Sequence, residues 1–94
     1  MRVLIIGTGY VGLNTGVMLA YLGNDVTCID LNQEKVKRLQ AGELTIFEPH
    51  LDELFTEVHQ TMHFVNNYVE ADIPNQDVIF IAVNTPSLAD GNAD

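Results

Sequence analysis

Three glycines at a fixed spacing are the residues of this 94-residue chain best suited to bind a ligand. They lie in the segment 7–12, Gly-Thr-Gly-Tyr-Val-Gly. Gly7 allows a tight turn, Gly9 leaves no side chain between the backbone and a phosphate, and Gly12 lets a following helix approach the sheet. The amides after the turn, including those of Tyr10 and Val11, would face an anion that the helix dipole also attracts. The alternative is a tight turn without a ligand, but a bare turn seldom needs three glycines at this spacing.

An acid and a base follow the glycines at positions that suit a nucleotide. Asp30 ends the second apolar run, where its carboxylate could accept hydrogen bonds from both hydroxyls of an adenosine ribose. The same charge would repel the 2′-phosphate of NADP, so NAD is the expected cofactor. Lys35 could reach the adenosine side. The alternatives are that Asp30 caps the helix beginning near Asn32 and that Lys35 lies on a solvated helix face.

The elements that would position these residues alternate between strands and helices. Apolar runs predict strands at 2–6, 26–29, 62–65 and 78–83, and three- and four-residue spacings predict helices at 10–22, 33–40 and 49–58. One further helical turn is expected at 68–71, before Pro74. This alternation predicts an α/β fold: a partial Rossmann domain with a parallel sheet in the order 3-2-1-4 and helices on both faces.

Thr85 follows the last predicted strand, beside the crevice where ligands bind in such sheets. It could donate a hydrogen bond to the cofactor, and the alternative is a plain Thr-Pro turn. Cys28 lies within the second strand, where we expect a buried, inert thiol. His59 and His63 would suit a metal only on one continuous helix, and His50 is remote from both. The chain is therefore predicted to hold neither catalytic residues nor a metal site.

The net charge of −9 is unevenly distributed. All four basic residues precede residue 43, which leaves that part at +1 and the rest at −10. Nucleic-acid binding is not expected, because it depends on clustered Lys and Arg. No apolar run approaches the ~20 residues of a membrane span. The single cysteine excludes an internal disulfide and fits the reducing cytoplasm.

The chain has the length of one small domain, so we expect residues 1–94 to be the N-terminal part of a dinucleotide-binding domain, with the rest of an enzyme absent. The fourth strand would then be a bare apolar edge. A second copy of the chain is one candidate partner for that edge. The alternative from another functional class is a non-catalytic nucleotide-binding or interaction module that pairs through it.

Four segments together resemble the N-terminal NAD-binding domain of the UDP-glucose/GDP-mannose dehydrogenase family. They are 7–13 (GTGYVGL), 29–36 (IDLNQEKV), 46–49 (IFEP) and 80–94, which contains Val-Asn-Thr-Pro-Ser. The resemblance implies oxidation of a sugar C6 alcohol to a carboxylate in two NAD-dependent steps, through a cysteine-bound intermediate. It implies UDP-glucose as the substrate, with GDP-mannose or a UDP-N-acetylhexosamine as alternatives.

The same resemblance implies roles for particular residues. The amides around Tyr10 and Val11 would hold the pyrophosphate, Asp30 and Lys35 would lie at the adenosine end, and Thr85 would contact the cofactor. The family's catalytic cysteine, lysine and aspartate belong to segments that this chain does not contain, and Cys28 does not match that cysteine. The fragment alone is therefore expected to be inactive.

The sequence departs from the family in one loop, which usually reads Glu-Pro-Gly. His50 stands in place of the glycine and Thr45 in place of a proline. If the glycine position needs a positive φ, His50 strains or reshapes the loop. The glycine-rich segment is untouched, so the prediction of cofactor binding does not depend on this loop.

Overall fold

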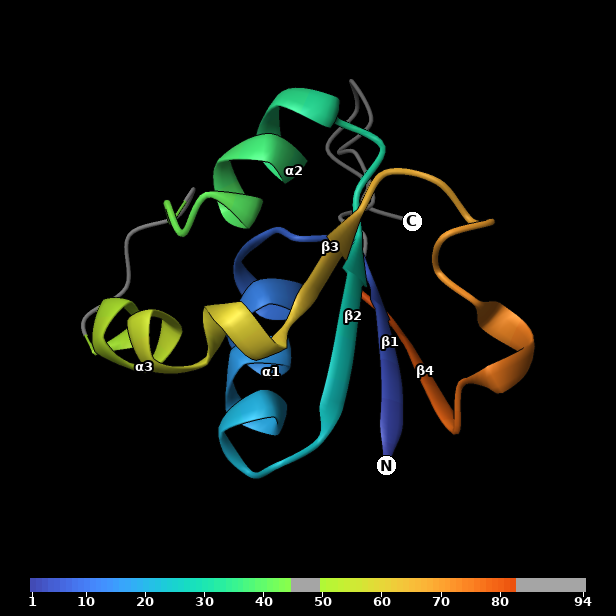
Figure 1. Ribbon diagram of the computed structural model, residues 1–94, viewed down its shortest axis with the longest axis horizontal. Coiled ribbons are helices and arrows are strands. Elements are labelled where there is room, and N and C mark those ends of the chain that lie inside the picture. Colours follow the sequence, from blue (N-terminus) through green and yellow to red (C-terminus); the bar gives the residue numbers. More distant parts are fainter. Residues whose placement is uncertain (45–49, 83–94) are drawn as a thin grey trace, which may run out of the picture.

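A four-stranded parallel sheet forms the centre of the computed structural model, which describes residues 1–44 and 50–82. Strands β1 (Arg2–Ile6), β2 (Asp25–Ile29), β3 (His63–Val65) and β4 (Val78–Ile81) stand in the order β3-β2-β1-β4 (Figure 1). Ile6 lies opposite both Ile29 and Ile81, so the carboxyl ends of three strands meet at one edge of the sheet. This arrangement confirms the predicted α/β class and strand order.

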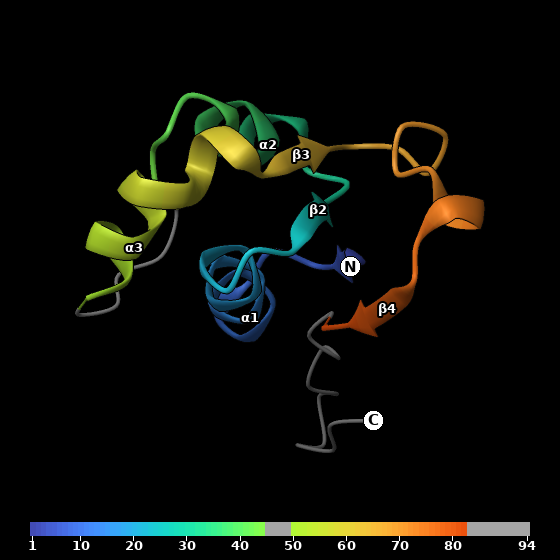
Figure 2. The same ribbon diagram turned by 60° about the horizontal axis from the view of Figure 1, so that its bottom comes forward.

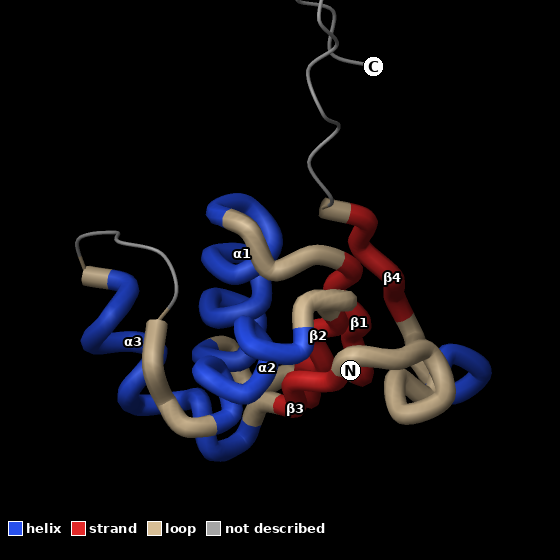
Figure 3. Tube along the Cα trace, turned by 90° about the horizontal axis from the view of Figure 1, so that it is seen from above, coloured by secondary structure: helices blue, strands red, loops and turns tan. Residues whose placement is uncertain are grey.

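The three α-helices lie on one face of the sheet. They are α1 (Tyr10–Tyr21), α2 (Gln33–Gln40) and α3 (Leu51–Val58), and α3 continues into the 3₁₀ helix η1 (His59–Thr61). Figure 2 and Figure 3 show the opposite face carrying the crossover from β3 to β4, which contains the 3₁₀ helix η2 (Ile73–Asn75). Among residues 1–44 and 50–82, the second face carries the 3₁₀ helix η2 and no α-helix, so there the expectation of helices on both faces holds only in a reduced form.

The core is divided by the sheet, because successive side chains of a strand point to opposite faces. Val3 and Ile5 pack among the helices, whereas Leu4 packs with Ala71 of the crossover. Helix α1 lies close to β2 at Gly16, where an added Cβ would be 3.0 Å from Cys28 Sγ. A methyl group at position 16 would require only a small shift of its neighbours, whereas a larger side chain would press on the sheet.

The predicted helical turn at 68–71 is wrong. Those residues form turns, and the 3₁₀ helix follows them with Pro74 in its first positions. Proline is tolerated there because its missing N–H would have no partner in the first turn. Helix α3 begins at Leu51 rather than Pro49, which lies outside the described residues, as does the predicted end of the fourth strand at Val83. Within the described ranges, every helix is too short or too polar to cross a bilayer.

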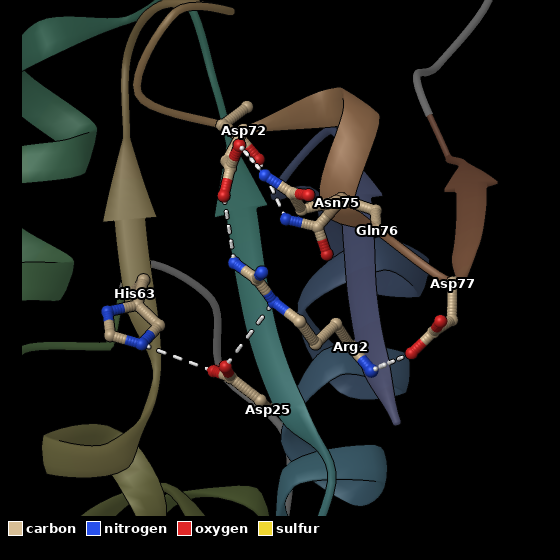
Figure 4. Close-up of polar contacts among 8 residues, drawn as sticks. Arg2, Asp25, His63, Asp72, Asn75, Gln76 and Asp77 are labelled. Atoms are coloured by element: carbon tan, nitrogen blue, oxygen red, sulfur yellow. Dashed lines mark hydrogen bonds and ion pairs between the residues drawn. The ribbon is translucent and has the colours of Figure 1, made fainter.

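A polar network joins the crossover to the amino ends of the strands (Figure 4). Arg2 Nη2 lies 3.0 Å from Asp72 Oδ2, and the Arg2 amide donates to Asp77 Oδ2 at 2.8 Å. His63 Nε2 on β3 lies 3.2 Å from Asp25 Oδ1 on β2. The basic side chain of β1 is therefore engaged at the edge of the sheet opposite the glycine turn.

Candidate functional site

The glycine turn connects β1 to α1 and leaves no space for a side chain at Gly12. Gly7 has φ 106° and its N–H donates to the Ile29 carbonyl at 2.9 Å, which continues the pairing of β1 with β2. A Cβ on Gly12 would collide with the Gly7 carbonyl and lie 3.2 Å from Ala82 Cβ. Gly9 is the N-cap of α1 in extended conformation and accepts the Leu13 amide at 2.9 Å. The spacing of the glycines therefore serves close packing of the helix start on the turn.

The start of α1 faces the carboxyl edge of the sheet. The first turn of this 12-residue helix carries no acidic residue, so its positive dipole end is not neutralised from within the helix. The side chains of Tyr10 and Val11 are 52% and 61% exposed. The helix start beside these two residues is therefore exposed to solvent, which the predicted anion site requires.

Asp30 follows β2 beside the glycine turn and is held by three neighbours. Its Oδ2 accepts the Thr8 hydroxyl at 2.6 Å and the Thr8 amide at 3.3 Å. Its Oδ1 accepts the Asn32 amide at 2.9 Å. Lys35 Nζ lies 3.5 Å from Oδ2. The N-cap of α2 is Asn32, whose side chain accepts the Lys35 amide at 3.1 Å, so Asp30 is not the cap.

These contacts keep the Asp30 carboxylate charged. Partial burial by itself would raise the pKa of this carboxyl. The hydrogen bonds from Thr8 and Asn32 and the nearby Lys35 ammonium outweigh burial and hold the pKa below its usual value. A fixed, ionised acceptor therefore stands at the end of β2.

A pocket of about 190 Å³ opens between the glycine turn and Asp30. Its walls are mainly apolar, and they consist of Ile6, Gly7, Ile29, Asp30, Leu31 and Tyr68. One flat apolar group beside one charged acceptor matches the chemistry of a base attached to a ribose. A larger open depression of about 510 Å³ runs along β3 past His59 and His63, away from the glycine turn. Its lining contains neither a residue of the glycine turn nor Asp30, so this depression is not the candidate nucleotide site.

The structure brings Gly7, Gly9, Gly12, Asp30 and Lys35 together, with Tyr10 and Val11 at the adjoining helix start. Thr85 lies outside the described residues. Two further residues belong to the site and were missed from the sequence: Thr8, which is 1% exposed, and Tyr68 in the pocket wall. A threonine between two glycines gave no signal by itself, and Tyr68 reaches the site only through the crossover.

The other candidate residues stand apart from this site. Cys28 is fully buried, and burial raises the pKa of its thiol to about 12, so it remains a protonated core residue as predicted. Among residues 1–44 and 50–82, no group of three potential metal ligands is close enough to hold an ion. His50 has φ 72°, a left-handed conformation that favours glycine. The histidine is therefore strained at this position, as expected if the glycine that the family usually has there needs a positive φ.

Comparison with known proteins gives relatives over the whole length of the chain. The chain is 44% identical over 96 residues to the UDP-glucose 6-dehydrogenase of Rickettsia bellii, covering 100% of this chain and 22% of the relative. A crystal structure of a GDP-mannose dehydrogenase from Pseudomonas aeruginosa superposes with a TM-score of 0.90 at 33% identity, covering 100% of this chain and 22% of the other. A UDP-glucose dehydrogenase from Pyrobaculum islandicum superposes with a TM-score of 0.87 at 38% identity, covering 99% and 22%.

The chain thus spans about a fifth of the length of these relatives, with 22% covered in each. Residues 1–94 match the NAD binding domain of the UDP-glucose/GDP-mannose dehydrogenase family. In this family, that domain binds NAD. The glycine turn, the charged acceptor after β2 and the strand order all agree with that match. The chain therefore belongs to the UDP-glucose/GDP-mannose dehydrogenase family, as its NAD-binding domain.

Proposed function

We propose that this chain binds NAD in preference to NADP and serves as the cofactor domain of a UDP-glucose 6-dehydrogenase-like oxidoreductase. The observation that carries the proposal is the ionised Asp30 carboxylate, held beside the glycine turn by Thr8, Asn32 and Lys35. A carboxylate at this place accepts ribose hydroxyls and repels a 2′-phosphate. Bound NAD would supply a hydride acceptor.

Each residue of the site has a distinct part in this proposal. The backbone amides around Tyr10 and Val11 hold the pyrophosphate, and Gly9 leaves that approach open. Asp30 accepts hydrogen bonds from the hydroxyls of the adenosine ribose, and Lys35 lies at the adenosine end of the cofactor. Thr85, outside the described residues, is proposed to donate a hydrogen bond to the cofactor.

The proposed substrate is UDP-glucose, oxidised at C6 to UDP-glucuronate. The support is the 44% identity with a UDP-glucose 6-dehydrogenase. The superposition on a GDP-mannose dehydrogenase keeps GDP-mannose as a second candidate. A UDP-N-acetylhexosamine is the third, because the chain also superposes on a UDP-N-acetyl-mannosamine dehydrogenase with a TM-score of 0.82 at 35% identity. Because the only cysteine is buried and protonated, it cannot attack a sugar carbon. We therefore propose that the chain alone binds the cofactor without oxidising a substrate.

The cofactor claim is tested by calorimetric titration of the folded chain with NAD and with NADP. We expect a heat of binding with NAD only. Asp30→Asn should weaken NAD binding about tenfold and reduce the discrimination against NADP. Asp25→Asn is the matched control, because it makes the same change at the exposed amino end of the same strand. A folded chain that binds neither nucleotide would refute the proposal.

The substrate claim needs the complete reading frame that contains this chain. We expect the purified product to reduce two NAD per UDP-glucose and to be much slower with GDP-mannose or a UDP-N-acetylhexosamine. Reduction with GDP-mannose alone would move the assignment to the second candidate. Absence of reduction with every sugar nucleotide, from a folded product that binds NAD, would remove the enzymatic assignment.

One observation favours a function of another class. Three apolar residues of β4 are exposed at the sheet edge: Ile79, Phe80 and Ile81, at 43%, 41% and 74%. An interaction module that pairs two copies through this edge predicts a stable dimer in light scattering and no nucleotide binding. A dimer with NAD binding instead would identify the edge as an oligomer contact of the dehydrogenase.

A further inference from the structure

Thr8 makes a contact that the glycine pattern does not call for. Its side chain is 1% exposed, although it lies between two glycines at the edge of the sheet. The hydroxyl donates to Asp30 Oδ2 at 2.6 Å, and the Thr8 amide approaches the same oxygen at 3.3 Å. An O–H to carboxylate bond of this length is among the strong, charge-assisted hydrogen bonds. The turn and the acid are therefore joined directly, across 22 positions of sequence.

The hydrogen bonds also decide which acceptor positions of Asp30 remain. A carboxylate has about four lone-pair positions, two on each oxygen. On Oδ2 the Thr8 hydroxyl takes one, while the Thr8 amide and Lys35 Nζ, at 3.3 and 3.5 Å, share the other. On Oδ1 the Asn32 amide takes one and leaves one. The carboxylate thus keeps one position on Oδ1 and a weakly held one on Oδ2, as two adjacent hydroxyls require.

We propose that Thr8 is a positioning residue, whose hydroxyl fixes the Asp30 carboxylate in the orientation that accepts the vicinal diol of a ribose. This inference rests on the NAD binding proposed above and adds a residue to it. The terminal torsion of an aspartate is broad, so an unrestrained carboxylate would lose rotational freedom on binding. The Thr8 hydroxyl removes that freedom beforehand. Because Thr8 lies within the glycine turn, the sites for pyrophosphate and ribose keep a constant separation.

The test compares Thr8→Val, which removes the hydroxyl at nearly constant shape, with Thr8→Ser, which keeps it. Two quantities are measured on the folded chain: NAD affinity as a function of pH, and the pKa of Asp30 by carbon-13 NMR without nucleotide. Thr27→Val is the matched control, since Thr27 is also buried, at 7% exposed, on the strand that leads to Asp30. Should Thr8→Val not fold, Thr8→Ala replaces it.

For Thr8→Val we expect about tenfold weaker NAD binding at neutral pH. We also expect a raised pKa of Asp30, so that affinity is lost at a higher pH as the solution is acidified. The NAD affinity of Thr8→Ser should stay within about twofold of that of the unmodified chain, and the affinity of Thr27→Val should equal that of the unmodified chain. A merely structural role of Thr8 would change stability without moving the pKa of Asp30.

Several results would overturn the inference. One is a Thr8→Val chain with unchanged affinity and an unchanged pKa of Asp30. Another is equal weakening by Thr8→Val and Thr8→Ser. Because Thr8→Ser keeps the hydroxyl, that result would assign the effect to the packing of the threonine side chain. Failure of both Thr8→Val and Thr8→Ala to fold would assign Thr8 to stability. If the unmodified chain binds no nucleotide, the proposed function fails, and the NMR titration still decides whether Thr8 restrains Asp30.

Discussion

Replacing Gly12 with alanine tests the close contact between α1 and the glycine turn. The new Cβ would collide with the Gly7 carbonyl oxygen and lie 3.2 Å from Ala82 Cβ. Backbone atoms cannot rotate away, so relief requires α1 to shift from the turn. Overpacking typically costs about 1–3 kcal/mol, and this backbone clash belongs at the upper end. Alanine returns about 1 kcal/mol through its better helix propensity, so a net loss of about 2 kcal/mol is expected.

The matched control is Gly16→Ala in the same helix, where the nearest atom is Cys28 Sγ at 3.0 Å and two side-chain carbons follow at 3.5 Å. A small shift of these side chains can admit the methyl group, so the packing cost and the gain in helix propensity roughly cancel.

Thermal unfolding followed by circular dichroism measures both variants. Since 1 kcal/mol corresponds to about 4–8 °C in a domain of this size, Gly12→Ala should lower Tm by roughly 8–16 °C. Gly16→Ala should change Tm by less than about 4 °C. The reasoning is refuted if Gly12→Ala melts with the unmodified chain, or if the two variants lose the same stability.

Three further predictions follow from single residues. His50→Gly should raise the free energy of unfolding by about 0.5–1 kcal/mol in urea titrations, because it relieves the strain of a histidine in the left-handed conformation. The control is Asp72→Gly, which also changes a residue at positive φ. It should give no gain in stability, since it removes the ion pair of Asp72 with Arg2. Cys28 should resist thiol reagents in the native chain and react fully in denaturant, and rapid native reaction would contradict its burial. The lowered pKa of Asp30 contributes stability above the unfolded pKa and loses it as pH falls through the folded pKa, so the difference in unfolding free energy from Asp30→Asn should shrink below about pH 4. A difference that is independent of pH would show that Asp30 contributes no such linkage.

Local patterns determined the fold class and most of the site. Unbroken apolar runs mark buried parallel strands, and the spacing of the glycines marks a strand-to-helix turn, because both follow from geometry within a few residues. Asn32 caps α2 for a similarly local reason, because its side chain accepts a hydrogen bond from the Lys35 amide three residues later. The helical turn predicted at 68–71 was wrong. That segment is too short for hydrophobic periodicity to separate a helical turn from other turns, and Pro74 follows it closely.

The sequence alone therefore determined the strand order, the glycine turn, the acid after β2 and the buried state of Cys28. Tertiary structure decided the state of that acid. Pairing of Ile6 with Ile29 places Thr8 against Asp30, and the crossover places Tyr68 over the same pocket. No local rule contains these contacts, because they join residues far apart in the chain through the register of a sheet. The sequence shows that a carboxylate is present, whereas the assembled sheet determines its orientation, its charge and the hydrogen-bond donors that surround it.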